Sequence, residues 1–213
     1  MNRRFILILI IAVFSNFGAI SQTDTTIYTQ KVDYYLTFLK EQGGKPDTSL
    51  KVGNYGLKLA RSASDTISII EFNLYIGDAY KSLNLFDSAI QAYEKAIDLC
   101  SPYVRQKYYA STNKKMGALY WKFNQFKNAS RKFQNALKAY QKMGVAIEVG
   151  KTFNNLGTIY KEVAQLDSAL YYHQKALVIF REIKEQKWIS NTFNLIGNVH
   201  LLLNNAALAR SYY

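Results

Sequence analysis

Histidine, cysteine and clustered carboxylates carry most enzyme and metal chemistry, and this chain of 213 residues has few of them. It contains two histidines and one cysteine, and its 15 acidic residues are scattered along the sequence. The metal-binding spacings HExxH and CxxC, the nucleophile motif GxSxG and the glycine-rich phosphate loop do not occur. The sequence therefore predicts no enzyme, no metal site and no cofactor.

The histidines and the cysteine are expected to have structural roles. His173 and His200 stand at positions where an internal repeat otherwise places Tyr or Phe, so both side chains should be packed rings. Cys100 has no second cysteine to pair with, and the sequence supplies no base close to it. We therefore expect Cys100 to be a small buried side chain rather than a nucleophile.

Positive charge is a stronger signal than any catalytic motif. The chain has 27 Lys and Arg against 15 Asp and Glu, a formal net charge of +12, which favours acidic partners. It contains no nucleic-acid recognition motif, and its aromatic residues stand at repeat positions, so we do not expect nucleic-acid binding. Lysines and asparagines can bind a peptide only if the fold places them on one surface.

A repeat of 40 residues determines how the chain presents these side chains. Four glycines recur at this interval, each followed three residues later by a ring and twelve residues later by an alanine. A glycine within a helix costs about 1 kcal/mol relative to alanine, so we expect two helices to approach too closely there for a methyl group. The glycines are Gly77, Gly117, Gly157 and Gly197; the rings are Tyr80, Tyr120, Tyr160 and His200; the alanines are Ala89, Ala129, Ala169 and Ala209.

Each copy of the repeat is predicted to form two helices. Apolar residues are spaced as on amphipathic helices, and polar breaks at 83–85, 123–125 and 163–166 divide the copies. The predicted units span about 30–69, 70–109, 110–149 and 150–189, with an incomplete unit at 190–213. The first unit matches least well, because Thr37 stands in place of its glycine.

This pattern resembles the tetratricopeptide repeat family over about residues 31–213. The period is that of the longer repeats in kinesin light chain-like and bacterial regulator arrays, although the family's early tryptophan and late proline are missing. The resemblance implies an all-α, right-handed solenoid of antiparallel helix pairs that binds a protein or peptide. The motif residues of the second copy are Ile76, Gly77, Tyr80, Ala89, Tyr93 and Ala96.

In this family the first helix of each pair lines a concave groove, and here the lining positions are rich in lysine and asparagine. An asparagine amide can both donate to and accept from an extended peptide, and a tryptophan can anchor an apolar side chain. The set that clamps a terminal carboxylate in some members is incomplete, because Ala118 and Leu195 occupy two of its polar positions. The expected groove residues are Lys114, Lys115, Trp121, Lys122, Lys151, Asn154, Asn155, Lys161, Asn191, Asn194 and Asn198.

The first 21 residues have the pattern of a signal peptide. Arg3 and Arg4 precede an apolar run at 5–14, and Ala19 and Ser21 suit cleavage after residue 21. The run is short for a membrane span, which needs about 20 apolar residues. We therefore expect export to the periplasm or cell envelope, leaving a repeat array at 22–213, with an uncleaved membrane anchor as the alternative.

The sequence stops at Tyr213, within the second helix of the fifth unit, where a solenoid normally carries a polar cap. We expect either a fragment or a further domain. Two functions stay open at this point. The first is an exported scaffold without catalysis that binds a protein or peptide, which the positive charge suggests is acidic. The second is the N-terminal sensor segment of a longer bacterial histidine kinase or helix-turn-helix regulator, with a membrane tether downstream.

Overall fold

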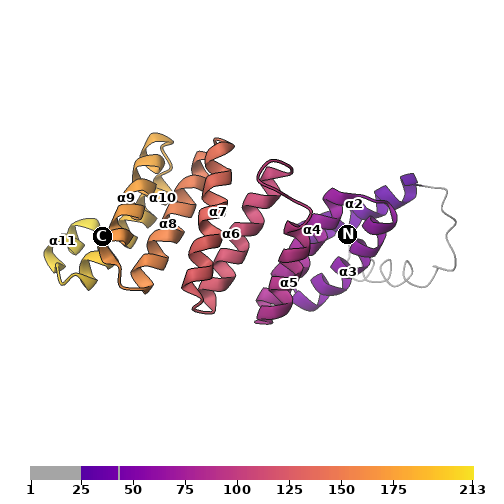
Figure 1. Cartoon of the computed structure of the whole chain (residues 1–213), viewed down its shortest axis with the longest axis horizontal. Helices are drawn as coiled ribbons and strands as arrows, with labels where there is room; N and C mark the ends of the chain where they lie inside the picture. The colour runs from indigo at the N-terminus through magenta and orange to yellow at the C-terminus, as the bar shows by residue number, and fades with distance from the viewer. Residues whose placement is uncertain (1–24, 43) are drawn as a thin grey trace.

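The computed structural model describes residues 25–42 and 44–213, and this part of the chain folds into ten α-helices without a β-strand. The helices follow one another as pairs stacked along one long axis (Figure 1). The all-α solenoid expected from the repeat is therefore confirmed, while the predicted signal peptide at 1–21 lies outside the described residues. The helices are α2 (Thr25–Gln42), α3 (Pro46–Ser62), α4 (Thr66–Ser82), α5 (Phe86–Ile97), α6 (Gln106–Lys122), α7 (Phe126–Lys142), α8 (Ala146–Glu162), α9 (Leu166–Glu182), α10 (Gln186–Leu202) and α11 (Ala206–Tyr212).

Helices begin every 20 residues from residue 46 to residue 206, and most are 17 residues long with a three-residue turn after them. Each of these turns contains one residue in the left-handed conformation. After α4, for example, the N–H of Leu85 donates to the Tyr80 carbonyl (3.0 Å) and that of Asn84 to the Lys81 carbonyl (3.2 Å). This Schellman motif satisfies carbonyls that the helix end leaves free. The left-handed residues are Ser64, Asn84, Asn124, Gly144, Ala164, Lys184 and Asn204.

Helix α5 is the exception, since it ends after 12 residues and a longer loop follows. Proline disfavours the helical conformation of the residue before it and clashes with the carbonyl four residues earlier. Pro102 therefore prevents α5 from continuing to the usual length. The loop is held by the Arg105 guanidinium, which donates to the Leu99 carbonyl (2.9 Å), and α6 then begins on the common 20-residue spacing.

The first helix of each pair begins at 66, 106, 146 and 186, four residues before the unit starts expected at about 70, 110, 150 and 190. The repeat motif lies in the later turns of that helix, so the first turn carried no motif residue. In α4 this turn is fixed by Asp65, whose carboxylate accepts from the N–H (3.1 Å) and hydroxyl (2.5 Å) of Ser68. Such a cap stabilises a helix N-terminus by about 1 kcal/mol.

The repeat glycines lie under the ring of the residue 16 positions later. A Cβ atom built on Gly77 would come within 2.5 Å of Tyr93, one on Gly117 within 2.9 Å of Phe133 and one on Gly157 within 2.6 Å of His173. These distances are below normal carbon–carbon contact, so the second helix can pack only against a residue without a side chain. The repeat alanines are fully buried in the same layer: Ala89, Ala129, Ala169 and Ala209.

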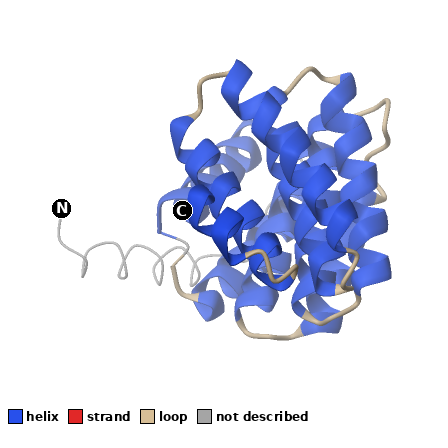
Figure 2. Ribbon diagram, turned by 90° about the vertical axis from the view of Figure 1, so that its left-hand side faces the viewer, coloured by secondary structure: helices blue, strands red, loops and turns tan. Residues whose placement is uncertain are grey.

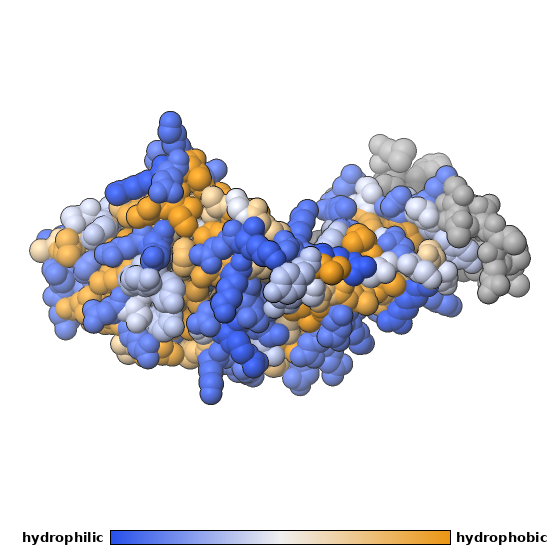
Figure 3. Space-filling model, turned by 45° about the horizontal axis from the view of Figure 1, so that its top comes forward, coloured by the Kyte–Doolittle hydropathy of each residue, from blue (hydrophilic) through white to orange (hydrophobic). Residues whose placement is uncertain are grey.

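In the described part of the chain, helices of the same kind in successive pairs contact one another only when both are the first of their pair, namely α2 with α4, α4 with α6, α6 with α8 and α8 with α10. We call these even-numbered elements the inner helices. Within the described residues the second helices of the pairs, which are the odd-numbered elements from α3 to α11, make no such contacts with each other. The stack therefore curves toward the inner helices. Figure 2 shows the stack from one end, with short loops joining the helices. On the surface, hydrophobic patches lie between hydrophilic side chains (Figure 3).

Candidate functional site

A hollow of about 410 Å³ lies across the inner helices, and we call it the inner hollow. It brings together six of the residues predicted to line the groove: Lys114, Lys115, Lys151, Asn154, Asn155 and Asn191. Its other lining residues are Lys81, Ala118, Thr158, Trp188 and Leu195. All eleven side chains come from α4, α6, α8 and α10, so four successive repeats contribute to one surface.

Helical spacing explains why these side chains share a face. On α8, Lys151, Asn155 and Thr158 stand at intervals of four and three residues, the spacing of neighbours along one side of a helix. The opposite side of α8 carries Phe153 and Leu156, which are buried between helix layers. The same division recurs on α6 and α10, because each begins at the same point of the 20-residue spacing.

Glu148 holds two of the lysines that line the hollow. Its carboxylate accepts from Lys114 of α6 and, at 3.0 Å, from Lys151 of its own helix. Burial alone raises the pKa of Glu148, but hydrogen bonds and charge from the two lysines outweigh burial and lower the pKa. The carboxylate is therefore ionised at neutral pH and holds both lysines over the hollow.

Asp78 has the same role one repeat earlier. It accepts from Lys115 (2.5 Å), from Lys81 (3.3 Å) and from the hydroxyl of Tyr93 (2.7 Å). Burial raises the pKa of Asp78, but Lys115, Tyr93 and Lys81 together lower it. Each of the four lysines at this site thus has a carboxylate partner, so the groove is less positive than its lysine content suggested. Four lysines against two carboxylates still leave positive charge in excess.

Asn154 holds the helices together rather than presenting an amide to solvent. Its side-chain NH₂ donates to the hydroxyl of Thr192 on α10 (2.8 Å), and its Oδ1 faces Nδ1 of His173 on α9 (3.0 Å). The residue is buried, with 4% of its surface exposed. Asn155, half-buried, and Asn191, exposed, are the amides that a ligand can reach.

Five predicted groove residues lie outside the inner hollow: Trp121, Lys122, Lys161, Asn194 and Asn198. Lys122 donates to the Asn84 side chain across the neighbouring turn (2.5 Å), and Lys161 forms an ion pair with Glu162 (3.0 Å). Asn198 accepts from the hydroxyl of Tyr213 (2.7 Å). These three therefore have partners on their own or adjacent elements. Trp121 is 42% exposed and remains a separate apolar point on α6.

Sequence reasoning missed Glu148 and Trp188, which both stand nine residues before a repeat glycine. The predicted boundaries at 150 and 190 placed these positions outside the inner helices. In the structure the Lys151 ammonium lies 4.9 Å from the centre of the Trp188 ring, which in turn stacks on Phe180 (5.7 Å). Tyr108 occupies the corresponding position of α6 and donates to Glu71 (2.7 Å). The regular helix starts were the signal that could have revealed these residues.

The two histidines and the cysteine lie outside the inner hollow and have packing roles. Burial lowers the pKa of His173 to about 4, and its ring lies against Gly157. His200 stacks on Tyr212 at 5.5 Å. Burial raises the pKa of the Cys100 thiol, which donates to the Ala96 carbonyl (3.3 Å). Among residues 25–42 and 44–213, no three His, Cys, Asp or Glu side chains are grouped to hold a metal ion. None of the described helices is long and apolar enough to cross a membrane.

Two segments of the sequence match families described as "Tetratricopeptide repeat". The first covers residues 71–103, which contain α5 and most of α4, and the second covers residues 148–213, which contain α9 to α11 and most of α8. No curated protein matches the sequence significantly.

Solved structures share the fold at low sequence identity. BtubC (BKLC) from P. vanneervenii is 17% identical with a TM-score of 0.66, over 88% of this chain and 86% of that protein. MamA from Desulfovibrio magneticus RS-1 is 18% identical with a TM-score of 0.65, over 90% and 93%. The apo form of RapI is 13% identical with a TM-score of 0.77, over 98% of this chain and 56% of RapI. This chain therefore spans little more than half of RapI, and the three likenesses show the solenoid fold alone.

Proposed function

Because the chain is a tetratricopeptide repeat protein, we propose that it is a scaffold without catalysis that binds an extended segment of another protein in the inner hollow. The observation that supports this proposal is the continuity of the hollow across four inner helices, with lysines and accessible amides on one surface. The helices are already formed, so binding does not require the groove to fold around its ligand. Preorganisation of this kind lowers the entropic cost of association.

The chemistry of the lining favours a segment that carries carboxylates. Asn155 and Asn191 can each donate to and accept from a peptide backbone. A carboxylate of the ligand can compete with Glu148 and Asp78 for their lysines, and the excess of lysines favours that exchange. Trp188 adds an aromatic surface beside Lys151. We propose that the partner is an acidic peptide segment whose affinity falls as salt screens these charges.

Selection of random peptides on the purified array tests this proposal. We expect the selected peptides to be rich in Asp and Glu, and the double variant Asn155→Ala/Asn191→Ala to bind them at least about tenfold more weakly without losing helicity, since each lost hydrogen bond costs about 1 kcal/mol. Lys122→Gln is the matched control, because Lys122 lies on an inner helix outside the hollow. Equal affinity of the double variant and the wild type would remove the inner hollow as the binding site.

Export is a separate proposal, and it rests on the sequence pattern of residues 3–21. The intact mass of the native protein from the cell-envelope fraction tests it. A mass that begins at Gln22 supports cleavage and export, whereas a mass that retains residues 1–21 opposes cleavage. The same measurement tests the alternative role as the sensor segment of a longer signalling protein, which requires a mass well above that of 213 residues.

A further inference from the structure

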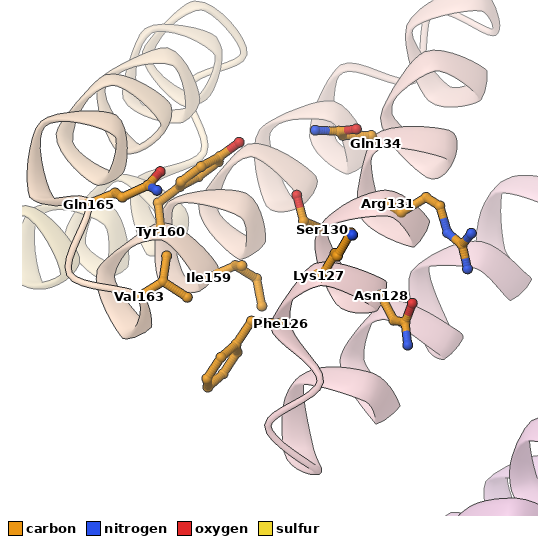
Figure 4. A pocket seen from close by; sticks show the side chains of 10 residues that line it. All are labelled: Phe126, Lys127, Asn128, Ser130, Arg131, Gln134, Ile159, Tyr160, Val163 and Gln165. Atoms are coloured by element: carbon orange, nitrogen blue, oxygen red, sulfur yellow. The ribbon is translucent and has the colours of Figure 1, made fainter.

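A second hollow, of about 470 Å³, lies between α7 and α8, and we call it the α7–α8 hollow. Its apolar lining consists of Phe126, Ile159, Tyr160 and Val163. Figure 4 shows Ile159, Tyr160 and Val163 on one side and Lys127, Ser130 and Arg131 on the other. The α7–α8 hollow shares no lining residue with the inner hollow.

The α7–α8 hollow is the place where the third unit departs from the repeat. Ser130 occupies the position taken by Ile90 in the unit before and by Leu170 in the unit after. Ile90 is buried between α5 and α6, where it packs with Met116 and Leu119. A serine hydroxyl cannot fill that volume, so the corresponding space between α7 and α8 is open.

The charges around this space depart from the repeat as well. Lys127 stands in the first turn of α7, where α5 and α9 carry Asp87 and Asp167. A cation at a helix N-terminus opposes the helix dipole and is unfavourable there. Arg131 stands one turn further on. Within the described part of the chain neither Lys127 nor Arg131 forms an ion pair, and no Asp or Glu lines the hollow.

We propose that the α7–α8 hollow is a second binding site, which takes one bulky apolar side chain from an acidic segment of a partner protein. The partner's side chain occupies the space beside Ser130 that is equivalent to the one Ile90 fills in the preceding unit. There it packs on Ile159, Tyr160 and Val163. Carboxylates beside it in the partner bind Lys127 and Arg131. Removing the side chain's apolar surface from water provides the affinity, and the two unpaired cations select the charge of the partner.

The repeat itself supplies the variants that test this site. Ser130→Ile installs the residue of the equivalent Ile90 position and closes the space, while Ser130→Ala leaves it open. Lys127→Asp installs the residue of Asp87 and Asp167, which favours the helix N-terminus. Because Ser130→Ile and Lys127→Asp both restore the repeat pattern, we expect melting temperatures at or above that of the wild type.

Binding is measured by fluorescence anisotropy with three fluorescein-labelled decapeptides. The first has one central leucine among glutamates, the second has alanine in place of leucine, and the third has lysines in place of glutamates. We expect the wild type and Ser130→Ala to bind the leucine–glutamate peptide at least about tenfold more tightly than either other peptide, since a leucine side chain buries several methylene equivalents. Ser130→Ile should lose this preference for leucine over alanine, and Lys127→Asp should weaken the preference for glutamate over lysine.

Three outcomes would overturn the proposal. One is retention of the leucine preference by Ser130→Ile with an unchanged melting curve. Another is loss of binding in the inner-hollow variant Asn155→Ala/Asn191→Ala but not in Ser130→Ile, which would place the peptide in the inner hollow. The third is no detectable binding of the leucine–glutamate peptide at concentrations up to about 1 mM. The α7–α8 hollow and the inner hollow can be tested separately, because Ser130→Ile changes only the first and Asn155→Ala/Asn191→Ala changes only the second.

Discussion

Oδ1 of Asn154 lies 3.0 Å from Nδ1 of His173, and this contact fixes the proton of the imidazole on Nδ1. The amide orientation follows from its other end, since the Asn154 NH₂ donates to Thr192, whose hydroxyl in turn donates to the Trp188 carbonyl (2.7 Å). An amide oxygen only accepts, so the ring nitrogen that faces it must donate. Nε2 of His173 is buried without a partner, and the ring is therefore held in its neutral form.

This neutral histidine should make the array less stable in mild acid. Burial lowers the pKa of His173 to about 4 in the folded protein, against 6.5 for a free histidine. Between these values the unfolded chain binds a proton that the folded chain does not, so stability is complete above pH 6.5 and falls as the pH approaches 4. The total loss is about 3 kcal/mol, at 1.36 kcal/mol per unit of pKa. Urea unfolding at pH 7.0 and pH 4.5 measures most of this loss, which is complete only below pH 4.

His173→Phe separates this effect from acid unfolding in general, because Phe133 occupies the same position one unit earlier. The variant leaves the Asn154 oxygen unpaired and should be less stable at pH 7 by about 1–3 kcal/mol. Its stability should nevertheless change less between pH 7.0 and pH 4.5 than that of the wild type. His200→Tyr, which restores the ring found at Tyr160, is the matched control. Equal pH slopes for wild type and His173→Phe would show that His173 titrates normally.

A side chain at Gly157 should disrupt the pair α8 and α9. The first atom of any side chain there would come within 2.6 Å of the His173 ring, which is fully buried and cannot move aside. We expect Gly157→Leu to lower the free energy of unfolding by about 3 kcal/mol or more, as overpacking of a tight core does. Gly44→Ala is the control, because nothing lies within 4 Å of a Cβ atom there. An unchanged melting curve for Gly157→Leu would contradict the packing described for the repeat glycines.

The turns allow a paired test of backbone strain. Ala164 and Gly144 occupy equivalent turns with left-handed φ angles of 57° and 67°, and no atom lies within 4 Å of a Cβ built on Gly144. An alanine in the left-handed conformation costs about 1–2 kcal/mol, and glycine avoids this cost. Glycine in turn makes the unfolded chain more flexible, which lowers stability by about 0.4–1 kcal/mol. Ala164→Gly should therefore raise the melting temperature and Gly144→Ala should lower it. Shifts of the same sign in both variants would exclude φ as the cause.

These turns also show where sequence reasoning was sufficient and where it was not. Gly77 and its three equivalents sit beneath a ring in the second to fifth units, so a period visible in the sequence was enough to predict helix pairs and their stacking. Ser64, Ala164 and Lys184 are ordinary residues in left-handed turns, and nothing in their type marks the helix boundary.

Two of the four ion pairs that hold the lysines of the inner hollow could not be predicted, because they join different repeats. Lys114 and Glu148 are 34 residues apart, and Lys115 and Asp78 are 37 apart, intervals that do not match the period of 40. Which lysine meets which carboxylate depends on how far each inner helix is rotated against the next. The lysine-rich surface was visible in the sequence, but its partial neutralisation by Glu148 and Asp78 follows only from that rotation.

Glu148 offers a direct test of this neutralisation. Its carboxylate, with a side chain 20% exposed, accepts from both Lys114 and Lys151, so Glu148→Gln releases two lysines toward the inner hollow. We expect the variant to bind an acidic peptide selected on the wild type several-fold more tightly at low salt, with a steeper loss of affinity as salt is added. Stability should fall by about 1 kcal/mol, since partly exposed ion pairs contribute little. Glu162→Gln, which frees only Lys161 outside the hollow, should leave the affinity unchanged. Isothermal titration at two salt concentrations measures both effects, and an affinity for Glu148→Gln equal to that of the wild type would mean that the ligand does not reach these lysines.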